Sequence, residues 1–173
     1  MMRSIFLFGA VALLASCSNN QSENKTVSDQ PAATAASASV QLKDDKLNAI
    51  YQHYIHLTTA LTNGDTAEAK VAGLAIETGA KELKGADALV SAANEIITAK
   101  ELESQRKSYS ALSNSFIALL KNSGLSSGEL YVDYCPMALN DQGAYWLSNV
   151  KEIRNPYFGA SMLSCGDIKE TIQ

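Results

Sequence analysis

Residues 46–70 read KLNAIYQHYIHLTTALTNGDTAEAK, and this stretch decides the fold. Its large apolar side chains recur every three or four residues, so they line one face of a helix. They are Leu47, Ile50, Tyr51, Tyr54, Leu57 and Leu61. Asn63-Gly64 breaks this helix, and Asp65 with Glu68 three residues later has the pattern of an acidic capping box. The stretch therefore predicts two consecutive helices joined by a tight turn.

Outward from this pair, the sequence predicts an antiparallel bundle of about four helices. The second helix runs through Ala67, Val71, Leu74 and Thr78, although Gly73 and Gly79 weaken its pattern. A third helix follows Gly85, and a fourth ends near Ser123-Gly124. Their apolar residues are Leu89, Ala92, Ala93, Ile96 and Ile97 in the third, and Tyr109, Leu112, Phe116, Leu119 and Leu120 in the fourth. Short connections favour antiparallel neighbours, so the fold class is mainly α.

The chain changes character from Ser126 onward. Pro136, Pro156 and several glycines exclude a long helix there, and the only tryptophan, Trp146, lies in this segment. Short strands are predicted near residues 130–132 and 144–147. We expect an ordered, loop-rich segment that packs against the bundle through its aromatic side chains.

The first residues have the layout of a bacterial lipoprotein signal. Arg3 supplies a basic flank, residues 5–14 are mostly apolar, and Leu14-Ala15-Ser16-Cys17 resembles the lipobox that precedes a lipidated cysteine. The apolar run is too short to span a bilayer. We therefore expect residues 1–16 to be removed and Cys17 to anchor the protein at a membrane through acyl chains.

Residues 17–40 contain almost no large apolar side chains, so they cannot bury enough surface to fold and would form a tether. Residues 41–173 have the size of one domain. Ser18 follows the lipidated cysteine, where an aspartate would favour retention in the inner membrane. We expect an envelope lipoprotein that faces the periplasm from the outer membrane.

Charge excludes one class of partner. Only Arg3 of the 14 basic residues lies in the predicted signal, so the remaining chain carries 13 minus 18, or −5. Nucleic-acid binding requires a basic surface, and we expect none. The sequence also contains no glycine-rich phosphate loop, no His-Glu-x-x-His motif and no serine nucleophile elbow. We expect a protein that is not an enzyme.

Two cysteines remain once Cys17 is assigned to lipid, and each has a methionine nearby. Met137 follows Cys135 by two residues, and Met162 precedes Cys165 by three. Soft sulfur ligands select Cu(I) or a similar ion. These four side chains are therefore candidate ligands for one soft metal ion.

The same two cysteines also suit a disulfide, with the methionines as core filler. Exported proteins live in an oxidising compartment, where two remaining cysteines usually pair. Closing a loop of this length stabilises a fold by roughly 3 kcal/mol or more. The spacing of Cys135 and Cys165 leaves both interpretations open, and a reduced pair can bind an ion that an oxidised pair cannot.

The only histidines lie three residues apart on the first predicted helix. His53 flanks the apolar stripe, whereas His56 points toward solvent. His53 is the better candidate for an additional metal ligand. A cysteine nucleophile with His53 as its base is the enzymatic alternative, since the partners of a nucleophile assemble in space.

The C-terminal segment carries a dense pattern that resembles the signature of one family. The pattern comprises Cys135-Pro136-Met137-Ala138, Gly143-Ala144-Tyr145-Trp146-Leu147-Ser148, Glu152-Ile153-Arg154-Asn155-Pro156-Tyr157-Phe158-Gly159, Met162-Leu163 and Cys165-Gly166. That family is a domain of unknown function found in stand-alone lipoproteins and fused to periplasmic adaptor subunits of copper and silver efflux pumps. Weaker resemblance extends upstream into the first predicted helix.

The resemblance implies a helical domain that handles soft metals at the cell envelope. Both cysteines and both methionines fall on signature positions. So do Trp146, Arg154, Asn155, Pro156 and Tyr157, for which we expect an architectural role or a partner surface. Asn155-Pro156 would set a turn, and Arg154 would bind backbone carbonyls or an acidic partner.

Together these observations predict a lipid-anchored periplasmic protein that binds copper or another soft ion as an accessory to efflux or metal homeostasis. Efflux components are the expected partners. The alternative is a disulfide-stabilised interaction module of the envelope that binds no metal. It would recognise its partner through the aromatic surface around Trp146 and Tyr157.

Overall fold

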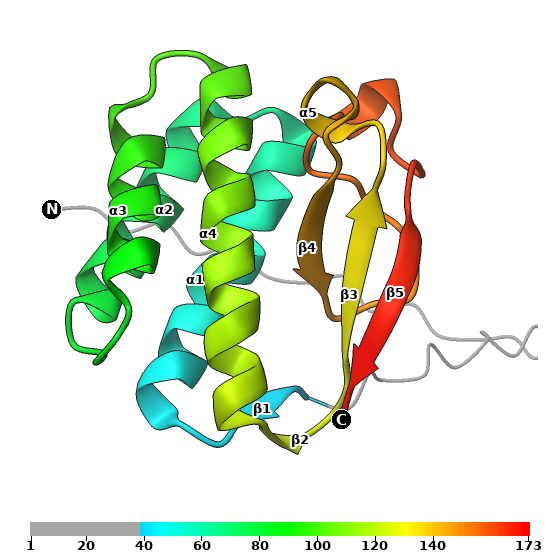
Figure 1. The fold of residues 1–173 in the computed structure, drawn as a ribbon. Coiled ribbons are helices and arrows are strands. Elements are labelled where there is room, and N and C mark those ends of the chain that lie inside the picture. Colours follow the sequence, from blue (N-terminus) through cyan, green and yellow to red (C-terminus); the bar gives the residue numbers. More distant parts are fainter. Residues whose placement is uncertain (1–38) are drawn as a thin grey trace, which may run out of the picture. The chain divides into compact units, whose positions relative to one another are not determined.

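A computed structural model describes residues 39–173, so the predicted signal, Cys17 and nearly all of the tether lie outside the described residues. Four long helices dominate the described part. They are α1 (Asp45–Asn63), α2 (Thr66–Ala80), α3 (Asp87–Thr98) and α4 (Leu102–Ser123). Each packs against the next one along the chain, as Figure 1 shows. The prediction of a mainly α fold built on an antiparallel bundle is confirmed.

The turn between α1 and α2 forms as its residues predict. Gly64 ends α1 with a left-handed φ of 73°. The Asp65 side chain then accepts hydrogen bonds from the backbone N–H groups of Ala67 at 3.1 Å and Glu68 at 3.0 Å. Glu68 does not complete the capping box in return, because its carboxylate lies 3.0 Å from Nε2 of His56. This contact joins α2 to α1.

The predicted apolar stripe of α2 is wrong. Val71 and Leu74 are 57% and 55% exposed, and the buried face of the helix consists mostly of small residues. These are Ala69, Ala72, Gly73, Ile76 and Ala80. A Cβ atom on Gly73 would already touch Ile96 of α3 at 3.4 Å. Small side chains bring α2 close to its neighbours, and of its three large apolar side chains only Ile76 is buried, while Val71 and Leu74 face outward.

The C-terminal segment forms a three-stranded antiparallel sheet. Its central strand, β3 (Leu130–Cys135), lies between β4 (Ala144–Ser148) and β5 (Asp167–Ile172). The predicted strands correspond to β3 and β4, whereas β5 was not predicted. A second, two-stranded sheet pairs β1 (Gln41–Leu42) with β2 (Leu125–Ser127). Strand β4 packs against α4, which places the larger sheet beside the bundle (Figure 1).

One buried phenol connects the bundle to this sheet. Tyr54 of α1 is fully buried, and its hydroxyl accepts hydrogen bonds from the Leu147 backbone N–H and from the Tyr109 hydroxyl, both at 2.9 Å. It also hydrogen-bonds to the hydroxyl of Ser113. The ring of Phe116 stacks on the ring of Tyr54 with a centroid distance of 4.8 Å. Burial raises the pKa of Tyr54, so this connection between α1, α4 and β4 stays neutral.

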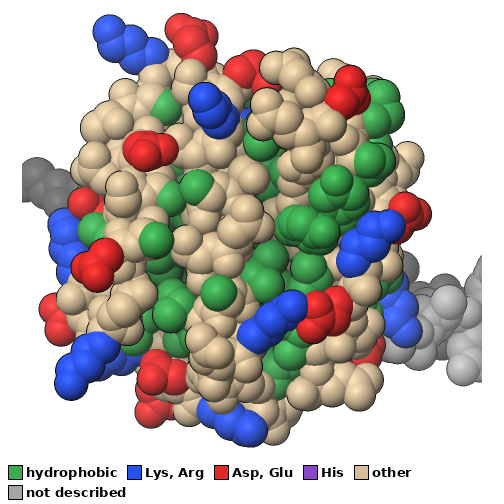
Figure 2. All heavy atoms as spheres, viewed as in Figure 1, with side chains coloured by type: hydrophobic (Ala, Val, Ile, Leu, Met, Phe, Trp, Pro, Cys, Tyr) green, Lys and Arg blue, Asp and Glu red, His purple; other side chains and the backbone are tan. Residues whose placement is uncertain are grey.

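The surface of the described residues is mixed in character. On the face shown in Figure 2, hydrophobic side chains gather over the sheet, and charged side chains are scattered both among them and over the rest of the face. Exposed large apolar residues in the C-terminal segment include Met137, Tyr145 and Ile168. Within residues 39–173, no helix has the length and hydrophobicity needed to span a membrane.

Candidate sulfur site in the C-terminal segment

Two antiparallel strands bring the cysteines together. Cys135 is the last residue of β3, and Cys165 lies two residues before β5 begins. Because paired antiparallel strands run in opposite directions, the end of one meets the start of the other. The two Sγ atoms lie 2.7 Å apart although 30 positions separate the residues in the chain, and both residues are free thiols in this structure. The site is thus a dithiol made by strand pairing.

The two thiols differ in their surroundings. Cys135 is completely buried, whereas Cys165 is partly exposed. The pKa of the Cys165 thiol is raised to about 11, first by its hydrogen bond with Cys135, then by partial loss of water, and further by the nearby charges of Cys135 and Asp167. At neutral pH the Cys165 thiol therefore keeps its proton.

Asn155 fixes the loop that carries Cys165. Its side chain is completely buried, and its Nδ2 donates to the Cys165 carbonyl at 2.7 Å. Its Oδ1 accepts from the backbone N–H groups of Tyr157 at 2.8 Å and Phe158 at 3.2 Å. The backbone N–H of Asn155 also donates to the Leu163 carbonyl at 2.8 Å. The side-chain amide of Asn155 thus sets the turn that follows it and also holds the backbone of Cys165, a candidate metal ligand.

A second anchor of this loop was not predicted. Arg106 of α4 is only 7% exposed, and its Nε donates to the Pro156 carbonyl at 2.9 Å. Its other nitrogens reach the Leu61 carbonyl at 3.2 Å and the Glu103 carboxylate at 2.8 Å. The carbonyl-binding role expected of Arg154 therefore belongs to Arg106, and Arg154 is exposed. The sequence does contain a sign of this role. Arg106 lies three residues before Tyr109, so both side chains fall on the buried face of α4.

The aromatic signature residues do not form a partner surface. Trp146 and Tyr157 are 1% and 3% exposed, and their rings pack edge to face at 6.0 Å. The Tyr157 hydroxyl donates to the Tyr145 carbonyl at 2.7 Å, and Pro156 is also buried. These side chains fill the space between the sheet and the bundle. The expected recognition surface around Trp146 and Tyr157 is therefore wrong, and their role is architectural.

The remaining predicted ligands are distributed unevenly. Met137 is 48% exposed and follows Cys135 by two residues, whereas Met162 is partly exposed and its carbonyl accepts the Cys165 N–H at 3.1 Å. His53 instead lines a groove between α1 and α2. Across residues 39–173, no three His, Cys, Asp or Glu side chains converge to hold a metal ion. The donors at the dithiol are therefore sulfur atoms, and His53 is not brought to them.

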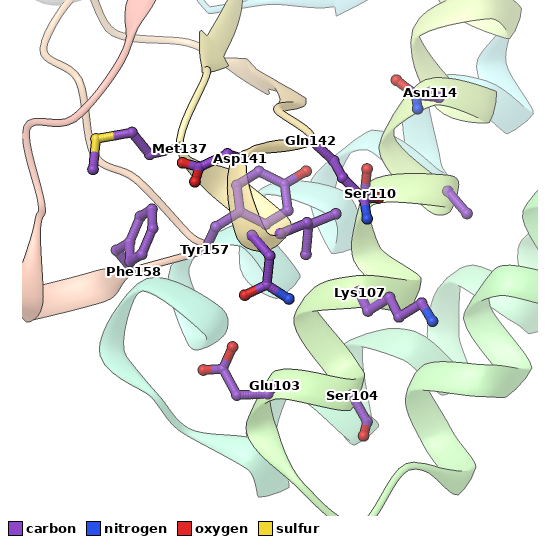
Figure 3. A pocket seen from close by; sticks show the side chains of 13 residues that line it. Glu103, Ser104, Lys107, Ser110, Asn114, Met137, Asp141, Gln142, Tyr157 and Phe158 are labelled. Carbon is purple, nitrogen blue, oxygen red and sulfur yellow. The ribbon is translucent and has the colours of Figure 1, made fainter.

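A polar groove of about 810 Å³ lies next to the sulfur site, between α4 and the short element α5 (Ala138–Asp141). Figure 3 shows Tyr157 between Met137 and Asp141 on one side and Lys107 and Ser110 of α4 on the other. Burial raises the pKa of the Tyr157 phenol well above its ordinary value, and the neighbouring Tyr54 raises it further. Met137, two residues after Cys135, also lines the groove, so the groove lies beside the end of β3 that carries this thiol.

The wall formed by α5 has an unusual backbone. Leu139, Asn140 and Asp141 have φ angles of 55°, 58° and 63°, so this element is a left-handed turn. Asparagine and aspartate tolerate this conformation, whereas a leucine there costs roughly 1–2 kcal/mol. Strain of this kind persists where the surrounding structure imposes it, often at functional sites. Here the left-handed turn reverses the chain between the end of β3 at Cys135 and the start of β4.

The fold and the site define a helical domain, completed by an antiparallel sheet, that carries a dithiol at one end of that sheet. Residues 50–128 match the model of a family described as a protein of unknown function (DUF3347). The match begins within α1 and ends just after β2, so the segment that contains Cys135 and Cys165 lies beyond it. No curated protein and no solved structure matches the chain significantly.

Proposed function

We propose that this chain is a lipid-anchored envelope protein, facing the periplasm from the outer membrane, that binds a soft metal ion as an accessory to metal efflux or homeostasis. Cu(I) is the first candidate, because thiolate and thioether donors select it. The observation that supports this proposal best is that strand pairing brings the sulfurs of Cys135 and Cys165 into direct contact although 30 positions separate them in the chain. Lipidation of Cys17 would hold the site near the membrane where efflux components work.

The donor set fits a soft ion after a small rearrangement. Metal–sulfur bonds are about 2.3 Å long for zinc, so two sulfurs on one ion lie roughly 4 Å apart. Rotation of the partly exposed Cys165 side chain can supply this movement while its backbone stays held by Asn155, whereas Cys135 is held in the core. Met137 offers an exposed thioether two residues from Cys135. Because binding must displace the thiol protons, affinity should rise with pH.

Titration of the reduced, unlipidated protein with Cu(I) under a competing chelator tests the proposal. Cys135→Ser and Cys165→Ser should each remove tight binding, and Met137→Leu should lower the affinity by about tenfold, the effect of losing one weak donor. Ser161→Ala, on an exposed neighbour, is the matched control and should bind normally. Binding that is indifferent to both cysteine changes would contradict a sulfur site.

The envelope role has its own test. Deletion of the gene should sensitise cells to copper, and the wild-type chain should restore growth where the Cys135→Ser chain does not. If both chains restore growth, the protein's role in copper tolerance does not depend on metal binding at the dithiol. Growth without any copper phenotype would contradict the link to homeostasis.

A disulfide-stabilised interaction module is the second candidate, and one surface favours it. The groove between α1 and α2 has a volume of about 500 Å³ and is lined by the exposed Val71 and Leu74 together with Ile50. Exposed apolar grooves between helices suit an amphipathic helix of a partner. A photo-crosslinking residue at position 74 should then capture one protein in intact cells, and one at the exposed Ala118 of α4 should not.

A further inference from the structure

The dithiol is accessible from one side only. Cys135 belongs to the hydrophobic core and is 0% exposed, whereas Cys165 is partly exposed in the loop that leads into β5. A reagent that arrives from solvent therefore meets the Cys165 sulfur first. Cys135 lies directly behind it, with 2.7 Å between the two Sγ atoms.

We propose that Cys165 is a thiolation site, where a small-molecule disulfide forms a mixed disulfide that the buried Cys135 then resolves. This reaction would regulate the soft-metal site by converting its two thiols into a disulfide that no longer binds the ion. Only this regulatory consequence rests on the proposed function. The order of the two steps rests on the geometry of the thiols.

The chemistry needs an organic disulfide, RSSR, such as oxidised glutathione. Cys165 loses its proton and its sulfur attacks one sulfur of RSSR, so a protein–SR bond forms, the RS–SR bond breaks and RS⁻ leaves to take up a proton. Cys135 then loses its proton and attacks the Cys165 sulfur, which expels the second RS⁻. Two protein thiols are oxidised by two electrons in total, and RSSR is reduced to two RSH.

The packing around the loop enforces this order. Asn155 holds the Cys165 carbonyl at 2.7 Å, so the loop does not swing away to expose the thiol behind it. Gly166 lies directly against Trp146, since a Cβ atom at this glycine would come within 2.9 Å of the indole ring. Cys135 itself stands on the central strand, opposite the buried Ala144 of β4. Reaching Cys135 directly would require local unfolding of this packing.

Two single-cysteine variants test the inference, in a chain that starts at residue 17 and carries Cys17→Ser. With oxidised glutathione and intact-mass detection, Cys135→Ser, which keeps Cys165, should gain one glutathione. The matched Cys165→Ser chain, which keeps Cys135, should react at least about 100-fold more slowly, because it must first open locally. In guanidinium the two variants should react at similar rates, which shows that both thiols are chemically competent.

Equal rates for the two folded variants, or faster reaction at Cys135, would overturn the inference. If Cys135→Ser fails to fold, Cys135→Ala keeps the site apolar, and peptide mapping of briefly alkylated wild-type protein should find Cys165 modified first. Cu(I) titration before and after oxidation separates the two proposals. Thiolation at Cys165 in a protein that never binds Cu(I) refutes the metal proposal alone, whereas Cu(I) binding without selective reaction at Cys165 refutes this one.

Discussion

A single buried guanidinium joins the helical bundle to the segment that carries the cysteines. Arg106 binds the carbonyls of Pro156 in the loop and Leu61 at the end of α1, and its charge is paired with Glu103. Hydrogen bonds from a charged donor are stronger than neutral ones, and carbonyls left without a donor in a buried place are costly. Much of the loop's attachment therefore depends on this one side chain.

Arg106→Met should lower the free energy of unfolding by about 3 kcal/mol, because it leaves the buried Pro156 carbonyl without its donor and removes the charged donor from the Leu61 carbonyl, which keeps only the Gly64 N–H. The next residue provides the matched control, since Lys107 is exposed on the same helix and Lys107→Met should change stability by less than about 0.5 kcal/mol. Urea unfolding followed by circular dichroism measures both. Equal effects of the two changes would mean that Arg106 anchors nothing.

Asp133 is a second residue of interest, because its buried surroundings change the pKa of its carboxyl group. It is 0% exposed at the centre of β3, and neither carboxylate oxygen has a hydrogen-bond partner among the described residues. Loss of water raises its pKa from 3.8 to about 7. Between these values the folded protein keeps a proton that the unfolded chain has released, so stability is fully present below about pH 4 and falls as pH rises toward 7.

Asp133→Asn should remove this dependence on pH. At about 1.4 kcal/mol per pKa unit, the wild type should lose up to about 4 kcal/mol of stability between pH 4 and pH 8, and the variant should lose much less. Unfolding by urea across that range gives both curves. Asp141→Asn, at an exposed carboxylate, is the control and should leave the wild-type slope intact. Parallel curves for Asp133→Asn and the wild type would contradict the assignment.

Among the elements, the docking of the short 3₁₀ helix η1 (Gly159–Ser161) onto α1 depends most on a single glycine. Gly159 has a φ of 56°, and a Cβ atom there would lie 2.5 Å from the Thr62 carbonyl oxygen and 3.0 Å from Arg106. The obstacle is backbone, which cannot rotate away. Gly85 has a similar φ of 76°, but a Cβ atom there would meet nothing within 4 Å.

The two glycines form a matched pair. Gly85→Ala should cost about 1 kcal/mol through its left-handed backbone alone. Gly159→Ala should cost about 3 kcal/mol, since the loop must also move away from α1. Thermal unfolding of both variants checks the difference. Similar losses in both would show that strain in the backbone dominates and that the close approach to α1 is unimportant.

The elements also show what the sequence could predict. Large apolar periodicity and the glycines that interrupt it located α1, α3 and α4, because those helices bury large side chains against the core. The same rule chose the wrong face of α2, where small residues make the contact and Val71 and Leu74 face solvent. Strand β5 was missed because it is an exposed edge strand with the charged residues Lys169 and Glu170, which resembles a loop in sequence.

For the molecule as a whole, the oxidation state of the dithiol should strongly affect the stability of the fold. A disulfide between Cys135 and Cys165 would close a loop spanning 30 positions, which in the chain-entropy model stabilises the fold by about 3–4 kcal/mol. Oxidised wild-type protein should therefore unfold at higher urea concentration than reduced protein. The Cys135→Ser/Cys165→Ser double variant should be insensitive to reductant, and a shift in that variant would implicate another group.

The sequence predicted the members of this site better than its arrangement. Cysteines and methionines stood out by spacing, but their grouping required the pairing of β3 with β5, which joins residues far apart in the chain. The roles of Arg106 and Asp133 depend on burial in the folded molecule, which local pattern does not encode. Trp146 was expected either to pack against the bundle or to form a partner surface, because aromatic residues in loop-rich segments serve packing and recognition alike.

The position of Arg106 limits how this domain can be divided. The anchor lies in the helical part that the family model covers, while the carbonyl it binds belongs to the cysteine-bearing segment beyond that match. A graft of residues 125–173 onto another helical scaffold would lack the Arg106 guanidinium that holds the loop. Conversely, the helical bundle alone would keep Arg106 but lose the Pro156 carbonyl that accepts its hydrogen bond. The helices and the dithiol segment should therefore be inherited and engineered as one unit, with position 106 transplanted along with the loop that it holds.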